Sequence, residues 1–172
     1  MRLVVFGWGN EARGDDGLGP LILARIAAAG WRGVTIVEDY QLQIEHALDI
    51  ADNDCALFVD AGRATPAPFS FRAVAPRRVL THTTHALAPE AVLDVYAQIN
   101  ARPPPPAFAL CVRGERFELG EGLSAEAAHR LEAAWAFVQG LMRERSVVAW
   151  EKAAARPLPP LRGKVDARSA AG

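Results

Sequence analysis

The chain has 172 residues, a formal net charge of −1 and a hydrophobic fraction of 51%. This length and composition predict one domain with enough apolar side chains for one core. The near-neutral charge excludes the basic surface typical of nucleic-acid binding, and no apolar run approaches the roughly 20 residues of a membrane span.

Two further features indicate a cytoplasmic protein. No small-residue cleavage site follows the first apolar run, so we expect no signal peptide. Cys55 and Cys111 both lie in apolar, strand-like runs, which predicts buried, reduced thiols and no disulfide framework.

Strand and helix patterns alternate along the chain. Short apolar runs predict strands at residues 3–6, 34–37, 55–59, 69–74 and 108–112. The fourth of these has the alternating pattern of a half-exposed strand, which fits the edge of a sheet. Helical spacing predicts helices after Gly19, over residues 44–51, from Pro89 to Ile99, and after an N-cap at Ser124. The alternation predicts a three-layer α/β/α sandwich around a twisted, mainly parallel sheet of about five strands.

The end of the chain differs in composition from the rest. Proline, alanine and charged residues replace the periodic pattern from about Ala153 onward. We assign residues 1–150 to the α/β domain and expect residues 151–172 to form a disordered C-terminal tail.

The first twenty residues place acid next to a strand. The predicted strand at residues 3–6 runs into a glycine-rich turn that carries Asp15 and Asp16. Ligands of open α/β sheets bind at the carboxyl ends of strands, so these carboxylates are candidates for a functional site. The crowded turn also predicts a positive φ at one or more of its glycines, which are Gly7, Gly9, Gly14 and Gly17.

Asp16, Asp60 and His85 are the candidate site residues. Asp16 follows the first strand, Asp60 closes the third, and His85 precedes the third helix, so all three could meet at one rim of a parallel sheet. Two carboxylates and an imidazole suit nickel or zinc better than calcium or magnesium. Each residue also has a plain structural alternative, namely a helix cap, a turn acid or a solvated histidine.

The same opening also matches a dinucleotide-binding pattern. Residues 7–12 read G-x-G-x-x-A after a strand, and Glu38 or Asp39 could contact a ribose. However, residues 13–17 separate this pattern from the helix, and their two carboxylates would repel a pyrophosphate. An NAD(P)-binding oxidoreductase-type Rossmann domain is therefore the alternative hypothesis.

The motifs taken together resemble the nickel-iron hydrogenase maturation protease family. The signature glycines and acids occupy residues 7–10 and 14–19, an Asp-Ala pair follows the third strand at Asp60, and His85 precedes an amphipathic helix. Residues 117–124 match the family's late segment, so the resemblance covers about residues 1–145. The leucine at position 93, eight residues after His85, favours His85 over His82.

The resemblance implies an endopeptidase that removes the C-terminal extension of a hydrogenase large-subunit precursor. Asp16, Asp60 and His85 would be both its catalytic and its metal-binding residues, in a nickel-dependent peptidase of aspartic or metallo type. The nickel would be supplied by the precursor, not bound permanently. Asp15 and Glu45 are candidates for a general base, and a non-catalytic nickel-sensing chaperone is a further alternative.

The resemblance also suggests a branch and a docking surface. Residues 39–45 are similar to the branch that serves cytoplasmic NAD-reducing or bidirectional hydrogenases, whereas position 16 is Asp where some members have Glu. We expect the precursor to dock on the rim formed by residues 8–16, 40–45 and 81–85, with Trp8 and Tyr40 as aromatic anchors unless Trp8 packs in the core.

Overall fold

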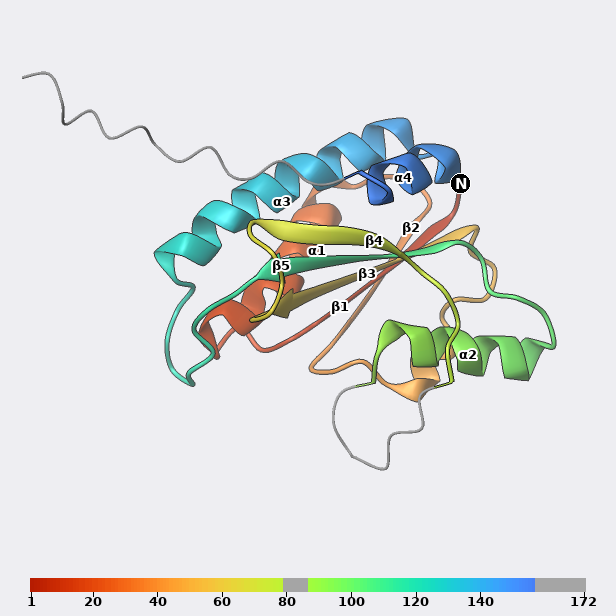
Figure 1. The fold of residues 1–172 in the computed structure, drawn as a ribbon, viewed down its shortest axis with the longest axis horizontal. Helices are drawn as coiled ribbons and strands as arrows, with labels where there is room; N and C mark the ends of the chain where they lie inside the picture. The colour runs from red at the N-terminus through yellow and green to blue at the C-terminus, as the bar shows by residue number, and fades with distance from the viewer. Residues whose placement is uncertain (79–86, 157–172) are drawn as a thin grey trace, which may run out of the picture.

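The computed structural model describes residues 1–78 and 87–156. Within these ranges, five strands form one sheet in the order β2-β1-β3-β5-β4. The strands are β1 (Leu3–Trp8), β2 (Val34–Asp39), β3 (Cys55–Gly62), β4 (Phe69–Val74) and β5 (Ala107–Arg113). Four strands are parallel, and β4 pairs antiparallel with β5 at one edge (Figure 1). The predicted mainly parallel sheet and its edge strand are confirmed.

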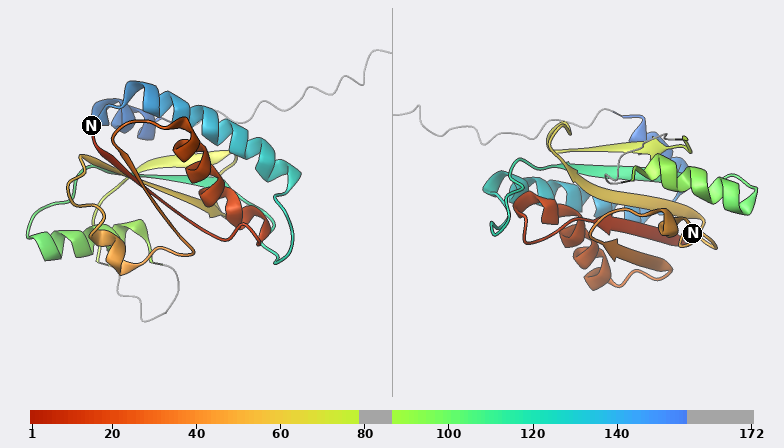
Figure 2. Two further views of the ribbon diagram at one scale, coloured as in Figure 1. Left: turned by 180° about the vertical axis from the view of Figure 1, so that it is seen from behind. Right: turned by 90° about the horizontal axis from the view of Figure 1, so that it is seen from below.

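Helices cover both faces of this sheet. One face carries α1 (Leu18–Ala29), α3 (Ala125–Glu144) and α4 (Val147–Ala154), and the other carries α2 (Pro89–Asn100) with the short 3₁₀ helix η2 (Ile44–Ala47), as Figure 2 shows. Side chains of β1 alternate between the faces, so Leu3 and Val5 join the core under α1 and α3 while Val4 and Phe6 join the core under α2. The three-layer architecture is therefore as predicted.

The predicted cap of the long helix is present. The Ser124 side chain accepts a hydrogen bond from the Ala127 N–H at 3.2 Å, which satisfies one of the free amides of the first turn of α3. The end of α1 is equally defined, because Gly30 adopts the left-handed conformation.

The predicted helix over residues 44–51 is wrong in its extent. Only one 3₁₀ turn forms, η2, and Ile44 and Leu48 are exposed although the helical pattern placed them in the core. Leu42, Ala47 and Ile50 are buried instead. Leu42 precedes the turn, and Ala47 and Ile50 are only three residues apart, so their burial does not require a longer helix.

An unpredicted helix, α4, packs on the edge of the sheet. Its Trp150 is fully buried, lies edge-on to Phe71 and Phe108, and donates from Nε1 to the Leu141 carbonyl at 3.0 Å. The helix runs to Ala154, and residues 157–172 of the predicted tail lie outside the described residues. No helix in the described part of the chain is long and apolar enough to cross a membrane.

Candidate functional site

Three loops meet at the carboxyl ends of β1, β3 and β5. The first, residues 9–17, leads into α1 and contains the 3₁₀ turn η1 (Gly14–Gly17). The second, residues 63–68, follows β3, and the third, residues 114–124, joins β5 to α3. The sequence predicted functional residues at this end of the sheet.

Asp16 lies half-buried in the first loop, and its position is fixed by the loop backbone. Its Oδ2 accepts a hydrogen bond from the Asn10 N–H at 2.9 Å. Gly9 has a φ of 137°, and a Cβ at that position would collide with the Asp16 carbonyl oxygen. Gly14 also has a positive φ, of 58°. The predicted positive φ in this turn is therefore confirmed at two glycines.

Asp60 lies half-buried within β3, and its side chain is on the face covered by α2 because it alternates with buried Val59. Burial is the main reason that the pKa of the Asp60 carboxyl is raised to about 7. A hydrogen bond from the Ala61 N–H, at 2.7 Å, acts in the opposite direction and lowers this pKa. The negative charge of Asp16 raises this pKa further. Two of the predicted site residues therefore lie near enough to repel each other electrostatically.

Cys111, which the sequence pattern assigns to the core, is a neighbour of this pair. It is the register partner of Asp60 on β5. Its apolar run predicted a fully buried side chain, but in the structure Cys111 is only half-buried. Its thiol lies 2.8 Å from the Thr65 hydroxyl, and burial, with a contribution from the Asp60 charge, raises its pKa. Only the pairing of β3 with β5 places it here, and no short sequence motif reports that pairing.

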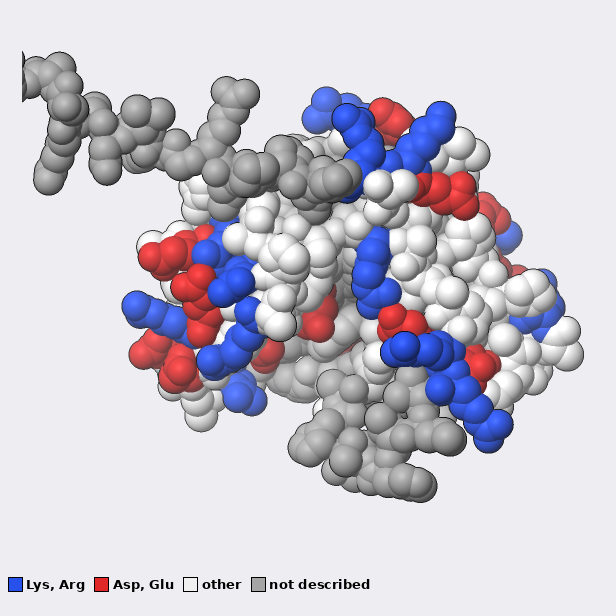
Figure 3. Space-filling view, viewed as in Figure 1, with Lys and Arg blue, Asp and Glu red and all other residues white. Residues whose placement is uncertain are grey.

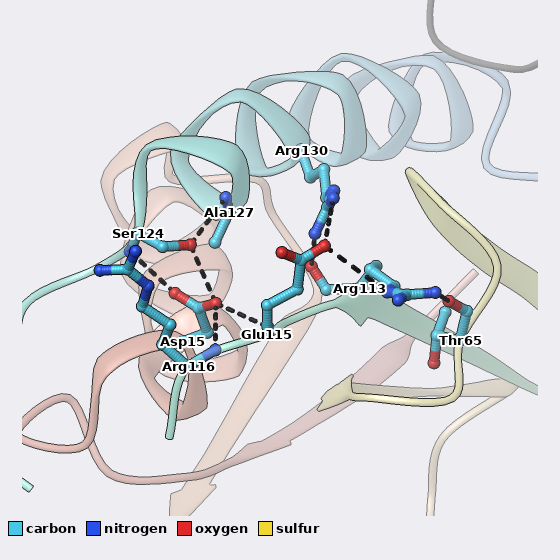
Figure 4. A network of polar contacts seen from close by, with 8 residues as sticks. All are labelled: Asp15, Thr65, Arg113, Glu115, Arg116, Ser124, Ala127 and Arg130. Atoms are coloured by element: carbon cyan, nitrogen blue, oxygen red, sulfur yellow. Dashed lines mark hydrogen bonds and ion pairs between the residues drawn. The ribbon is translucent and has the colours of Figure 1, made fainter. Parts of the chain in front are cut away.

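Asp15 points away from the rim, into the protein. It is fully buried, and its carboxylate accepts hydrogen bonds from the amides of Glu115, Arg116 and Ser124 and from the Ser124 hydroxyl, at 2.7 to 3.0 Å (Figure 4). A carboxylate engaged in this way has no open lone pair facing solvent. Asp15 therefore does not fit the role of general base, whereas the other candidate, Glu45, is exposed on η2.

The third predicted ligand, His85, lies outside the described residues, as does its neighbour His82. Among the residues that the structure describes, no three His, Cys, Asp or Glu side chains come together closely enough to hold a metal ion. Of the three predicted metal ligands, the structure therefore describes two, Asp16 and Asp60.

A cavity of about 540 Å³ adjoins the Asp16 loop at the ends of β1 and β2. Its lining consists of Gly9, Asn10, Glu11, Ala12, Pro20, Glu38, Asp39 and Tyr40. Tyr40 is 78% exposed beside it. Trp8 is only 9% exposed and packs edge-on against Phe58, so the core alternative holds for this residue.

The fold and this rim define an α/β/α sandwich with paired carboxylates at the carboxyl ends of neighbouring parallel strands. Solved structures of hydrogenase maturation proteases have the same fold. HycI from Thermococcus kodakarensis is 22% identical with a TM-score of 0.65, over 83% of this chain and 92% of that one. HybD from E. coli is 20% identical with a TM-score of 0.66, over 85% of this chain and 94% of that one.

The Hydrogenase 3 maturation protease is 20% identical with a TM-score of 0.59, over 79% of this chain and 88% of that one. Comparison of the sequence with protein-family models finds no match, and a search of the curated proteins finds no similar sequence. At these identities the likeness is one of fold. It confirms, at that level, the resemblance inferred from the sequence motifs.

Proposed function

We propose that this protein is an endopeptidase that removes the C-terminal extension of a nickel-iron hydrogenase large-subunit precursor after nickel insertion. The observation that carries the proposal is the electrostatically coupled pair Asp16 and Asp60, at the strand ends of a fold shared over most of its length with maturation proteases. The sequence motifs of that family coincide with these two positions.

The paired carboxylates support recognition of a nickel ion that belongs to the substrate. Two carboxylates that repel each other are stabilised when a divalent cation lies between them, which also lowers the pKa of Asp60. His85 would supply the nitrogen ligand of the set. Nickel shared between precursor and protease would hold the scissile bond in place and could polarise its carbonyl or activate a water.

A surface beside this rim fits a protein substrate. Tyr40 exposes its side chain beside the cavity at the ends of β1 and β2, and Ile44 and Leu48 are exposed a few residues later in the sequence. Tyrosine is one of the residue types that most often anchor protein interfaces. We assign this segment to precursor docking, and we place the reaction in the cytoplasm, with a precursor of the NAD-reducing or bidirectional type.

The surface charge agrees with a protein partner of no extreme charge. Acidic and basic side chains are interspersed on the face shown in Figure 3, in keeping with the net charge of −1.

A cleavage assay tests the proposal. Nickel-loaded precursor should be shortened by the wild-type protein, whereas nickel-free precursor should remain intact. Asp16→Ala, Asp60→Ala and His85→Ala should each abolish cleavage, and His82→Ala should be much milder and serves as the matched control. Circular dichroism establishes that the variants are folded.

The same assay separates the alternatives. Tight binding of the precursor by wild-type protein without any cleavage would favour a non-catalytic nickel-sensing chaperone. A change in NAD fluorescence on mixing, with an unchanged precursor, would favour a dinucleotide-binding domain. Loss of activity in His82→Ala but not in His85→Ala would show that the histidine was assigned to the wrong position.

A further inference from the structure

The two loops joined by Asp15 are distant in sequence but form one unit. Residues 12–15 and 116–121 are connected by three backbone hydrogen bonds, Gly14 N–H to Glu121, Asp15 N–H to Arg116 and Gly120 N–H to Ala12, at 2.7 to 3.0 Å. A Cβ on Gly14 would lie 2.7 Å from the Arg116 carbonyl oxygen, so the backbones touch. The loop that carries Asp16 is therefore backed by the loop between β5 and α3.

The Asp15 carboxylate completes this connection with four of its own hydrogen bonds. Three backbone amides and one hydroxyl thus donate to the two oxygens of a single buried side chain. Hydrogen bonds to a carboxylate are among the stronger ones in proteins, so this contact is a firm one.

The connection continues from the third loop to the second (Figure 4). Glu115 accepts from Arg130 at 2.7 Å, Arg130 donates to the Arg113 carbonyl at 3.2 Å, and Arg113 donates to the Thr65 carbonyl at 3.2 Å. Thr65 in turn contacts Cys111, the register partner of Asp60. A continuous chain of polar contacts thus runs from the Asp16 loop to the neighbourhood of Asp60.

We propose that Asp15 is the positioning residue of this site: its buried carboxylate locks η1 onto residues 115–124 and thereby holds the Asp16 carboxylate beside Asp60. This inference rests on the proposed function for its catalytic consequence, although the loop connection itself does not depend on it. Because Asp15 has no exposed surface, it cannot touch the precursor and acts only through Asp16.

Asp15→Asn tests the inference. The variant keeps the shape of the side chain but replaces one carboxylate oxygen by an amide N–H₂, so at least the hydrogen bond from the Ser124 N–H to Oδ1 becomes unfavourable. The three donors that face Oδ2 lose their charged acceptor and bond a neutral amide oxygen at best. Ser124→Ala is the second variant, which keeps the charge and removes only one bond to Asp15. Asp49→Asn, at an exposed position on the same scaffold, is the matched control, and Val138→Ala in the core of α3 controls for lost stability.

The first readout is amide hydrogen exchange, which needs no substrate. In Asp15→Asn, exchange at Glu115, Arg116 and Ser124 should accelerate by about tenfold or more, while the amides of β1 and the middle of α3 remain protected. Ser124→Ala should give a smaller effect at the same amides. Unchanged exchange at these three amides in both variants would overturn the connection.

The second readout is precursor cleavage, measured at a temperature at which all variants are folded. The kcat of Asp15→Asn should fall by about tenfold or more with KM little changed, while Asp49→Asn and Val138→Ala stay within about twofold of wild type. An equal fall in Val138→Ala would reduce Asp15 to a purely structural role and overturn the proposal. If wild-type protein fails to cut nickel-loaded precursor, the proposed function fails, and the exchange experiment still decides the connection between the loops.

Discussion

Replacing Asp60 by Asn should stabilise the protein, and increasingly so as the pH rises. The folded state raises the pKa of this carboxyl from 3.8 to about 7, chiefly by burial. About three pKa units, at about 1.4 kcal/mol each, correspond to an upper bound of ~4 kcal/mol. Since the side chain is half-buried and solvent screens its charge, we expect ~1–2 kcal/mol.

The sign follows from proton counting. Between about pH 4 and pH 7 the folded protein keeps the Asp60 proton that the unfolded chain has lost, so raising the pH favours unfolding. Asn carries no such proton, and its stability lacks this dependence. The gap between variant and wild type should therefore be small near pH 4, widen up to about pH 7, and remain constant above it.

Urea denaturation at each pH from 4 to 8 measures this gap, with Asp49→Asn as an exposed control that should follow wild type. Because both proteins share every other titrating group, the difference isolates Asp60 and its coupling to Asp16. A gap that is independent of pH, or that closes as the pH rises, would refute the raised pKa and with it the electrostatic account of the pair. A positive result would mean that the site is held at a cost in stability, as is common for functional groups.

Other substitutions probe the rim itself. Trp8→Ala should lower the free energy of unfolding by ~3 kcal/mol, because the side chain is buried against Phe58, and a normal urea midpoint would contradict that packing. Tyr40→Ala should leave the midpoint unchanged and weaken precursor binding by ~1–3 kcal/mol in titration calorimetry; undiminished affinity would remove this segment from the docking surface. Gly9→Ala should reduce soluble yield and cleavage more than Gly7→Ala, because its Cβ meets backbone at a positive φ, whereas at Gly7 it meets the movable end of Leu23. Equal yields and rates for the two glycine variants would contradict the strain argument.

The sequence predicted the sheet well because its strands carry a strong local signal. Residues 3–6 and 55–59 are continuous apolar runs, and such runs occur where both faces of a parallel strand are covered. The N-cap at Ser124 was also local, since a serine that caps a helix bonds an amide three residues on. The helix α4 was missed because its eight residues lie next to a proline-rich, aperiodic end of the chain.

The site was predictable only in part. Asp16 and Asp60 follow or end predicted strands, and sequence patterns locate strand ends well. His85 was selected with the help of the family motifs, and it lies outside the described residues. The sequence pattern assigns Cys111 to the core because it lies in an apolar run. Its position beside Asp60 depends on the register between β3 and β5, which is set by contacts between segments about 50 residues apart and leaves no local signal. The role of residues 114–124 was hidden for the same reason, since their partner is a loop 100 residues earlier.

The Asp15-Asp16 pair shows how one local motif acquires two functions. Consecutive residues of a 3₁₀ turn point about 120° apart, so two adjacent carboxylates in η1 cannot share one environment. Asp15 points inward, where amides from a distant loop donate to its carboxylate. Asp16 remains at the rim, where the Asn10 amide donates to it and its negative charge raises the pKa of Asp60. The hydrogen-bonded carboxylate of Asp15 joins the turn to the distant loop, whereas the carboxylate of Asp16 stays half-buried at the rim. A sequence with a single acid in this turn would have to give up one of these properties.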